Sequence, residues 1–144
     1  MELIQNRHEL IYTGLLFGTN FITARIRGYN IYSTWFFLLT VTTILFHGMF
    51  PDSYIMNFFD KIPILGIIIT GKILFYEKIM KCTSHMYILY IFFVISCYIV
   101  VIYIFYYRYL RDSFCFDKNE KIANTYHSLI HLISSIGHHF IILL

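Results

Sequence analysis

The sequence predicts an all-helical integral membrane protein with about five membrane-spanning helices, folded as one domain over residues 1–144. Hydrophobic residues make up 58% of the chain and charged residues only 13%, whereas a soluble domain carries about 25% charged residues. The apolar residues also fall in five runs that approach the roughly 20 residues a helix needs to cross a bilayer. The net charge is only +3 and the basic residues are scattered, so no nucleic-acid partner is expected.

The five predicted spans follow one another with short connections. Pro51 ends the second span because proline cannot continue a helix, and the nine residues PDSYIMNFF that begin there form the connection to the third span. The fourth span is the most apolar run, and a polar loop over residues 108–123 leads from it to the last span. The predicted spans are residues 9–24, 30–50, 60–76, 86–107 and 124–144.

Histidines in the last span indicate a function. His127 and His131 are four residues apart, so both project from one face of a helix. This spacing lets two imidazoles approach one metal ion, although it also occurs in hydrogen-bonded or interfacial histidine pairs. His138 falls on the same stripe about 10 Å further along the helix, too far to share that metal. We expect it to hydrogen-bond across helices or to line a cavity, with the first role favoured.

Two more residues reach the same side of the membrane if the spans alternate in direction. His47 lies at the end of the second span and Asp60 at the start of the third, level with the start of the fifth. Three histidines with an open fourth position are typical of catalytic zinc, which lowers the pKa of its bound water to about 7. Asp60 is then the candidate to orient that water or move its proton. The alternative is that Asp60 caps the third helix, and the two roles are compatible.

Thr43 lies one helical turn before His47, so its hydroxyl faces the same cavity. There it could donate a hydrogen bond to a developing oxyanion. The alternative is a hydrogen bond to the backbone carbonyl four residues earlier, which is common for threonine in membrane helices. Position alone favours that backbone bond.

Two segments of the chain resemble the motifs of a known family. Residues 127–137, HSLIHLISSIG, are similar to the last-helix motif HxxWHLLTGxG of the alkaline ceramidases, which belong to a superfamily that includes the adiponectin-receptor relatives. Residues 31–65, IYSTWFFLLTVTTILFHGMFPDSYIMNFFDKIPIL, resemble the family segment with SxxxH, a loop and LDELPM. Thr43 falls on the family serine, His47 on its histidine and Asp60 on its aspartate.

The resemblance implies a zinc-dependent amidohydrolase of endoplasmic reticulum or Golgi membranes that cleaves ceramide to a sphingoid base and a fatty acid. In the family, zinc is held by the histidines that match His47, His127 and His131. The aspartate that matches Asp60 acts on the zinc-bound water, and the serine that matches Thr43 sits in the same site. The implied partners are ceramide or a related lipid and the surrounding membrane lipids.

The chain departs from the family mainly in length. The family has seven helices, and the 67 residues from Asp60 to His127 are too few for its four intervening helices. Loss of one helix pair leaves the three histidines and Asp60 on the same side of the membrane but opens a wall of the cavity. A homodimer is therefore among the expected assemblies. Ile130 replaces the family tryptophan. Glu9 is the remnant of an acidic segment that is associated with calcium, and one carboxylate is a poor calcium site because calcium takes 6–8 oxygens.

Two alternatives to a ceramidase stay open at this point. Relatives use the same ligand set on lipid esters or GPI-linked lipids, and the sequence does not separate amide from ester cleavage. A zinc lipid esterase or phospholipase is therefore the second reading. The third is a catalytically inactive homologue that binds lipid, which the missing helices favour.

Overall fold

The computed structural model describes residues 2–81, 86–107 and 111–144, and in this part of the chain all regular structure is helical. The all-helical class that the sequence predicts is therefore confirmed. The elements are α1 (Glu2–Gly14), α2 (Leu16–Ile26), α3 (Asn30–Ile44), the π-helix η1 (Leu45–Met49), α4 (Tyr54–Met80), α5 (Met86–Ile102), the π-helix η2 (Tyr103–Tyr107), the 3₁₀-helix η3 (Phe114–Phe116) and α6 (Glu120–Leu143).

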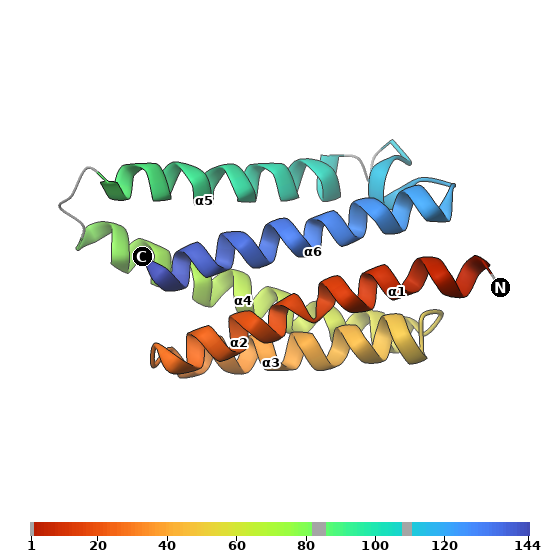
Figure 1. The fold of residues 1–144 in the computed structure, drawn as a ribbon, viewed down its shortest axis with the longest axis horizontal. Coiled ribbons are helices and arrows are strands. Elements are labelled where there is room, and N and C mark those ends of the chain that lie inside the picture. The colour runs from red at the N-terminus through yellow and green to blue at the C-terminus, as the bar shows by residue number, and fades with distance from the viewer. Residues whose placement is uncertain (1, 82–85, 108–110) are drawn as a thin grey trace.

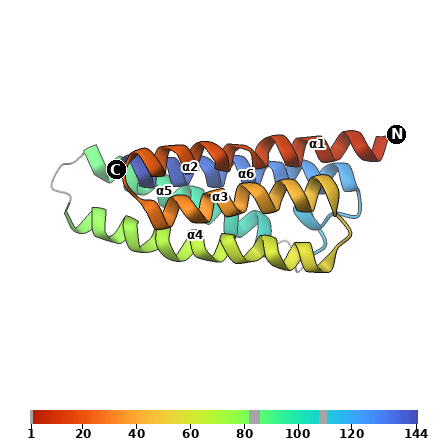
Figure 2. The same ribbon diagram turned by 90° about the horizontal axis from the view of Figure 1, so that it is seen from below.

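The helices lie side by side along one long axis and alternate in direction (Figure 1). α1 and α2 follow one another along nearly the same line, and α3 and α4 then form two antiparallel passes beside them, as Figure 2 shows. α6 lies between α5 and the α1–α2 pair and packs against all three. The end of α3, the start of α4 and the start of α6 therefore meet at the end of the bundle where α1 begins.

The helix boundaries differ from the predicted spans in several places. The predicted first span, residues 9–24, is two helices, with α1 ending at Gly14 and α2 beginning at Leu16. The second and fourth spans end in π-helical turns, and the last helix begins at Glu120, because the side chain of Asn119 accepts a hydrogen bond from the backbone N–H of Lys121 at 3.0 Å.

The predicted connection before the third span is mostly helical. α4 begins at Tyr54, because the side chain of Ser53 accepts a hydrogen bond from the backbone N–H of Met56 at 3.3 Å and so caps the helix. Asp60 consequently lies in the second turn of α4. Asp60 therefore does not cap this helix, which is the alternative role that its position in the sequence offers.

The bundle has polar groups in its interior and large apolar side chains on its outside. Asn20, Ser135 and His138 are buried together with an apolar cluster that includes Phe36 and Ile141. Large hydrophobic side chains are exposed on every long helix, for example Ile22, Phe37, Ile69, Phe92 and Leu143. In the described part of the chain, two helical segments, Asn30–Met49 and Tyr87–Tyr106, are long and apolar enough to cross a membrane.

Candidate metal centre

Three histidines from two distant parts of the chain meet at one end of the bundle. His47 comes from η1, and His127 and His131 come from α6. One ring nitrogen from each histidine lies within 4.8 Å of the corresponding nitrogens of the other two. His47 and His131 are buried, and His127 is partly buried. The structure therefore places the three histidines side by side.

This donor set suits a zinc ion. Nitrogens that bind zinc at about 2.0–2.1 Å with tetrahedral angles lie about 3.4 Å from one another. The separations here are at most 4.8 Å, so the ring nitrogens would need to approach one another by about 1.4 Å or less to reach this geometry. Three imidazoles leave a fourth tetrahedral position for water or substrate.

The backbone around the histidines explains their alignment. On α6, the four-residue spacing of His127 and His131 places their ring centroids 4.8 Å apart. His47 lies in a π-helical turn, in which the backbone N–H of Phe50 donates to the carbonyl oxygen of Leu45 at 2.9 Å. Such a turn holds one more residue than an α-helical turn and changes the direction of the side chains on it, and π-turns are frequent at functional sites.

The hydroxyl of Thr13 on α1 lies 3.2 Å from Nδ1 of His131. The same hydroxyl donates its proton to the carbonyl oxygen of Glu9 at 2.8 Å, so it is placed to accept a hydrogen bond from Nδ1–H of the imidazole. A protonated Nδ1 leaves the lone pair on Nε2 free for a metal, which is the usual arrangement of metal-binding histidines. No pattern in the sequence singles out Thr13, because its relation to His131 arises only from the packing of α1 on α6.

Asp60 is a buried carboxylate that two neighbouring threonines hold from α3. Thr42 donates a hydrogen bond to Oδ1 of Asp60 at 2.8 Å, and Thr43 donates to the same oxygen at 3.1 Å. Asp60 is only 9% exposed. The backbone hydrogen bond that position alone favours for Thr43 is therefore not the one that it makes. The helical spacing from His47 does not single out Thr42, because adjacent residues on a helix point in different directions.

α1 packs closely against the end of α3 and against η1. A Cβ atom at Gly14 would overlap Cγ2 of Thr43, so only glycine allows α1 to approach α3 at this point. A Cβ atom at Gly48 would lie 3.3 Å from the end of the Ile11 side chain. Two adjacent residues of α1 therefore make contacts in different directions. Thr13 bonds to His131, and Gly14 contacts Thr43, which donates a hydrogen bond to Asp60.

The other histidines of α6 lie outside this cluster and bond to neighbouring helices. Nδ1 of His138 is 2.6 Å from the hydroxyl of Tyr32 and 3.4 Å from that of Tyr98, so the expected bonding across helices is confirmed. Nδ1 of His139 lies 2.7 Å from the side-chain nitrogen of Asn20, which is placed to donate to it. His138 and His139 therefore tie α6 to its neighbours.

A scan against protein-family models, a search of curated proteins and a search of solved structures each returned no match to this chain.

Proposed function

We propose that this chain is an integral membrane, zinc-dependent hydrolase that cleaves the amide bond of ceramide to a sphingoid base and a fatty acid. The observation that carries the proposal is the convergence of His47, His127 and His131 within 4.8 Å at one end of the bundle. The buried carboxylate of Asp60 is bonded to Thr43, one helical turn from His47. The resemblance to the alkaline ceramidases adds the substrate class.

The distribution of side chains supports the membrane part of the proposal. α4 and α6 contain 27 and 24 residues and are therefore about 40 and 36 Å long, enough to cross a hydrocarbon layer of about 30 Å. The exposed apolar side chains on all the long helices suit contact with lipid tails. Asn20, Ser135 and His138 lie in the interior, where Ser135 bonds to Asn20 and His138 to Tyr32, as a bilayer requires of buried polar groups. We propose five spans, with α1 and α2 forming the first.

The proposed reaction is hydrolysis, in which a water oxygen bonds to the amide carbon, the C–N bond breaks and a proton moves to the leaving nitrogen. His47, His127 and His131 would hold the zinc, which would supply a Lewis acid that makes water nucleophilic near neutral pH. Asp60 accepts the proton that the water loses and passes it to the amine. Thr42 and Thr43 hold Oδ1 of this carboxylate, so Oδ2 is the oxygen left to carry the proton.

Aromatic side chains line the histidines and suit an apolar substrate. The ring of Phe17 lies 5.5 Å from that of His131, and the ring of Phe46 lies 4.7 Å from that of His47. These rings shield the cluster from bulk water and strengthen its electrostatic interactions. A lipid amide with two alkyl chains can reach such a site from the bilayer.

Metal analysis and turnover test the proposal directly. Protein purified in neutral detergent is expected to hold about one zinc per chain and to release fatty acid from ceramide, and a chelator should abolish the release. His131→Ala should lose both zinc and turnover, whereas the matched control His8→Ala, at an exposed histidine of α1, should keep both. Purified protein without stoichiometric zinc, or turnover retained in His131→Ala, would contradict the proposal.

A lipid panel separates the alternatives. Cleavage of lipid esters or phospholipids without cleavage of ceramide would identify a zinc esterase or phospholipase. Zinc binding without turnover of any lipid would identify an inactive lipid-binding homologue. Residence in the endoplasmic reticulum or Golgi and assembly as a homodimer are further parts of the proposal, and microscopy of tagged protein and its mass in detergent test them.

A further inference from the structure

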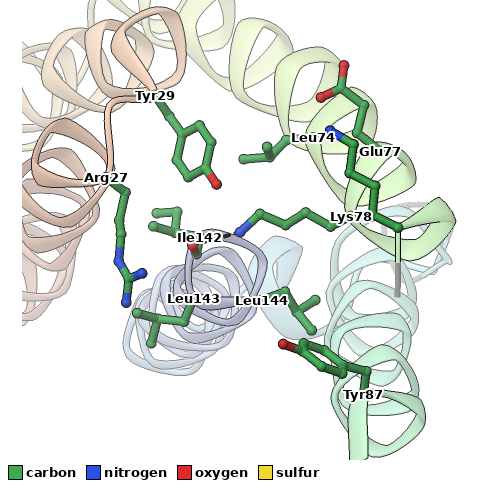
Figure 3. A pocket seen from close by; sticks show the side chains of 10 residues that line it. Arg27, Tyr29, Leu74, Glu77, Lys78, Tyr87, Ile142, Leu143 and Leu144 are labelled. Atoms are coloured by element: carbon green, nitrogen blue, oxygen red, sulfur yellow. Dashed lines mark hydrogen bonds between the residues drawn. The ribbon is translucent and has the colours of Figure 1, made fainter. Parts of the chain in front are cut away.

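A second polar site lies at the opposite end of the bundle from the histidines. A pocket of about 480 Å³ opens between the α2–α3 connection, the end of α4, the start of α5 and the end of α6 (Figure 3). Ile142, on its wall, lies 11 residues after His131 on the same helix, about 16 Å further along the axis. The pocket is therefore separate from the candidate metal centre.

Basic side chains dominate the lining of this pocket. Arg27, Lys78 and Lys81 contribute three positive charges, against one side-chain carboxylate from Glu77. Arg27 follows the end of α2 and Lys78 lies in the last turn of α4, and burial, together with the positive charge of Arg27, lowers the pKa of Lys78. Figure 3 shows them on opposite sides of the end of α6, with Glu77 directed away from Arg27. The pocket therefore holds excess positive charge.

Lys78 is fixed in a position that can bind an anion. Its ammonium group donates a hydrogen bond to the backbone carbonyl oxygen of Ile142 at 2.8 Å, which Figure 3 marks, and lies 5.0 Å from the centre of the Tyr29 ring. An ammonium group has three N–H donors, so two remain after the bond to Ile142. Leu74 and Leu143 add apolar surface beside these donors.

We propose that this pocket binds a phosphate group, with Arg27 and Lys78 as its principal ligands. Basic pockets between membrane helices at the level of the lipid headgroups bind anionic headgroups in this way. The apolar walls suit the glycerol and first methylene groups that adjoin a lipid phosphate, and a soluble phosphate would use the same donors. This binding requires neither zinc nor turnover.

Thermal unfolding in neutral detergent tests the proposal on chelator-treated protein, so failure of the zinc proposal would not affect the result. Dioleoyl phosphatidic acid is expected to raise the unfolding midpoint saturably, whereas dioleoyl phosphatidylcholine is not. The double variant Arg27→Gln/Lys78→Gln should bind phosphatidic acid about 25-fold more weakly than the unmodified protein, because each lost positive charge should lower the affinity about fivefold. Lys72→Gln removes the same charge from an exposed position on α4 and should stay within twofold of the unmodified protein.

A parallel titration with inorganic phosphate at constant ionic strength identifies the source of the phosphate. A shift that inorganic phosphate produces and the double variant loses would support a soluble phosphate. A shift confined to phosphatidic acid would support a lipid headgroup. Equal shifts in the double variant, or no shift with either ligand, would overturn the proposal. Lys78→Arg should keep the binding, and native mass spectrometry of retained lipid gives a second measure if the double variant unfolds early.

Discussion

The hydroxyl of Thr13 and Nδ1 of His131 lie 3.2 Å apart, although 118 residues separate them in the chain. Because this hydroxyl already donates to the Glu9 carbonyl, it can hold the proton of the imidazole on Nδ1. Nε2 is then the nitrogen that faces a metal. Thr13 is thus a positioning residue for the proposed zinc ligand.

Thr13→Val should weaken zinc binding by about 10- to 100-fold, because loss of a partner behind a metal-binding histidine has this effect. Competition with a fluorescent chelator measures the affinity. Thr19→Val is the matched control, since the hydroxyl of Thr19 is exposed and bonds to the carbonyl of Leu16 in its own helix. Equal zinc affinity in the Thr13 variant and the unmodified protein would show that Thr13 does not position His131.

Asp60→Asn should keep zinc but lower turnover by at least about 100-fold, because the amide cannot accept the proton of the attacking water. Thr43→Val should lower kcat about tenfold with little change in KM, since it removes one of the two hydroxyls that hold Oδ1 of Asp60. Thr43→Ser keeps the donor and should restore the rate. Steady-state kinetics with bound zinc measured on each variant checks this, and full turnover in Asp60→Asn would remove Asp60 from the mechanism.

Gly14→Ala should destabilise the bundle by about 1–3 kcal/mol, because the added methyl overlaps Cγ2 of Thr43 and forces α1 away from α3. Gly18→Ala is the control, because a Cβ at that position would meet Thr40 at an ordinary 3.7 Å. Combining Gly14→Ala with Thr43→Ser removes the overlapping methyl and should recover most of the loss. Equilibrium unfolding in mixed micelles measures these differences, and additive effects in the double variant would argue against this contact.

The three histidines could be predicted from the sequence because two simple regularities place them. Four-residue spacing aligns His127 with His131 on one helix face, and helices that alternate in direction bring the end of α3 to the start of α6. Both regularities survive errors in helix boundaries. The additional helical turns at Tyr54–Phe59 do not change the direction of any helix, so the histidines still meet at one end of the bundle. They place Asp60 in the second turn of α4 rather than at its start.

The remaining features of the site depend on packing between distant segments. The approach of Thr13 to His131 requires the contact of α1 with α6, which no local pattern encodes. The bond from Thr42 to Asp60 likewise requires the contact of α3 with α4. Hydrophobic periodicity predicts which faces are buried, but not which hydroxyl meets which carboxylate.

The thiol of Cys115 should react slowly with alkylating agents. Cys115 lies in η3, in the loop between α5 and α6, and burial raises its pKa to about 11, whereas an unperturbed cysteine has a pKa of about 8.5. Only the thiolate reacts, so at pH 8 iodoacetamide should modify it about 100-fold more slowly than in unfolded protein. The rate should rise about tenfold per pH unit from pH 8 to 10. Intact mass of a Cys82→Ser/Cys97→Ser variant measures the rate, and a plateau near pH 9 would contradict this prediction.

Tyr32→Phe should destabilise the bundle by about 1 kcal/mol while leaving zinc binding and turnover unchanged. It removes the hydroxyl that lies 2.6 Å from Nδ1 of His138 in the interior of the bundle. Hydrogen bonds between the helices of membrane proteins contribute about that much. The hydroxyl of Tyr98, 3.4 Å from the same nitrogen, keeps part of the interaction. Tyr12→Phe, at a side chain that is 67% exposed, is the matched control and should leave the free energy of unfolding unchanged. Loss of zinc in Tyr32→Phe would show that His138 contributes to the metal centre, because its bond to Tyr32 lies about two helical turns from His131 and should not otherwise affect the ligands.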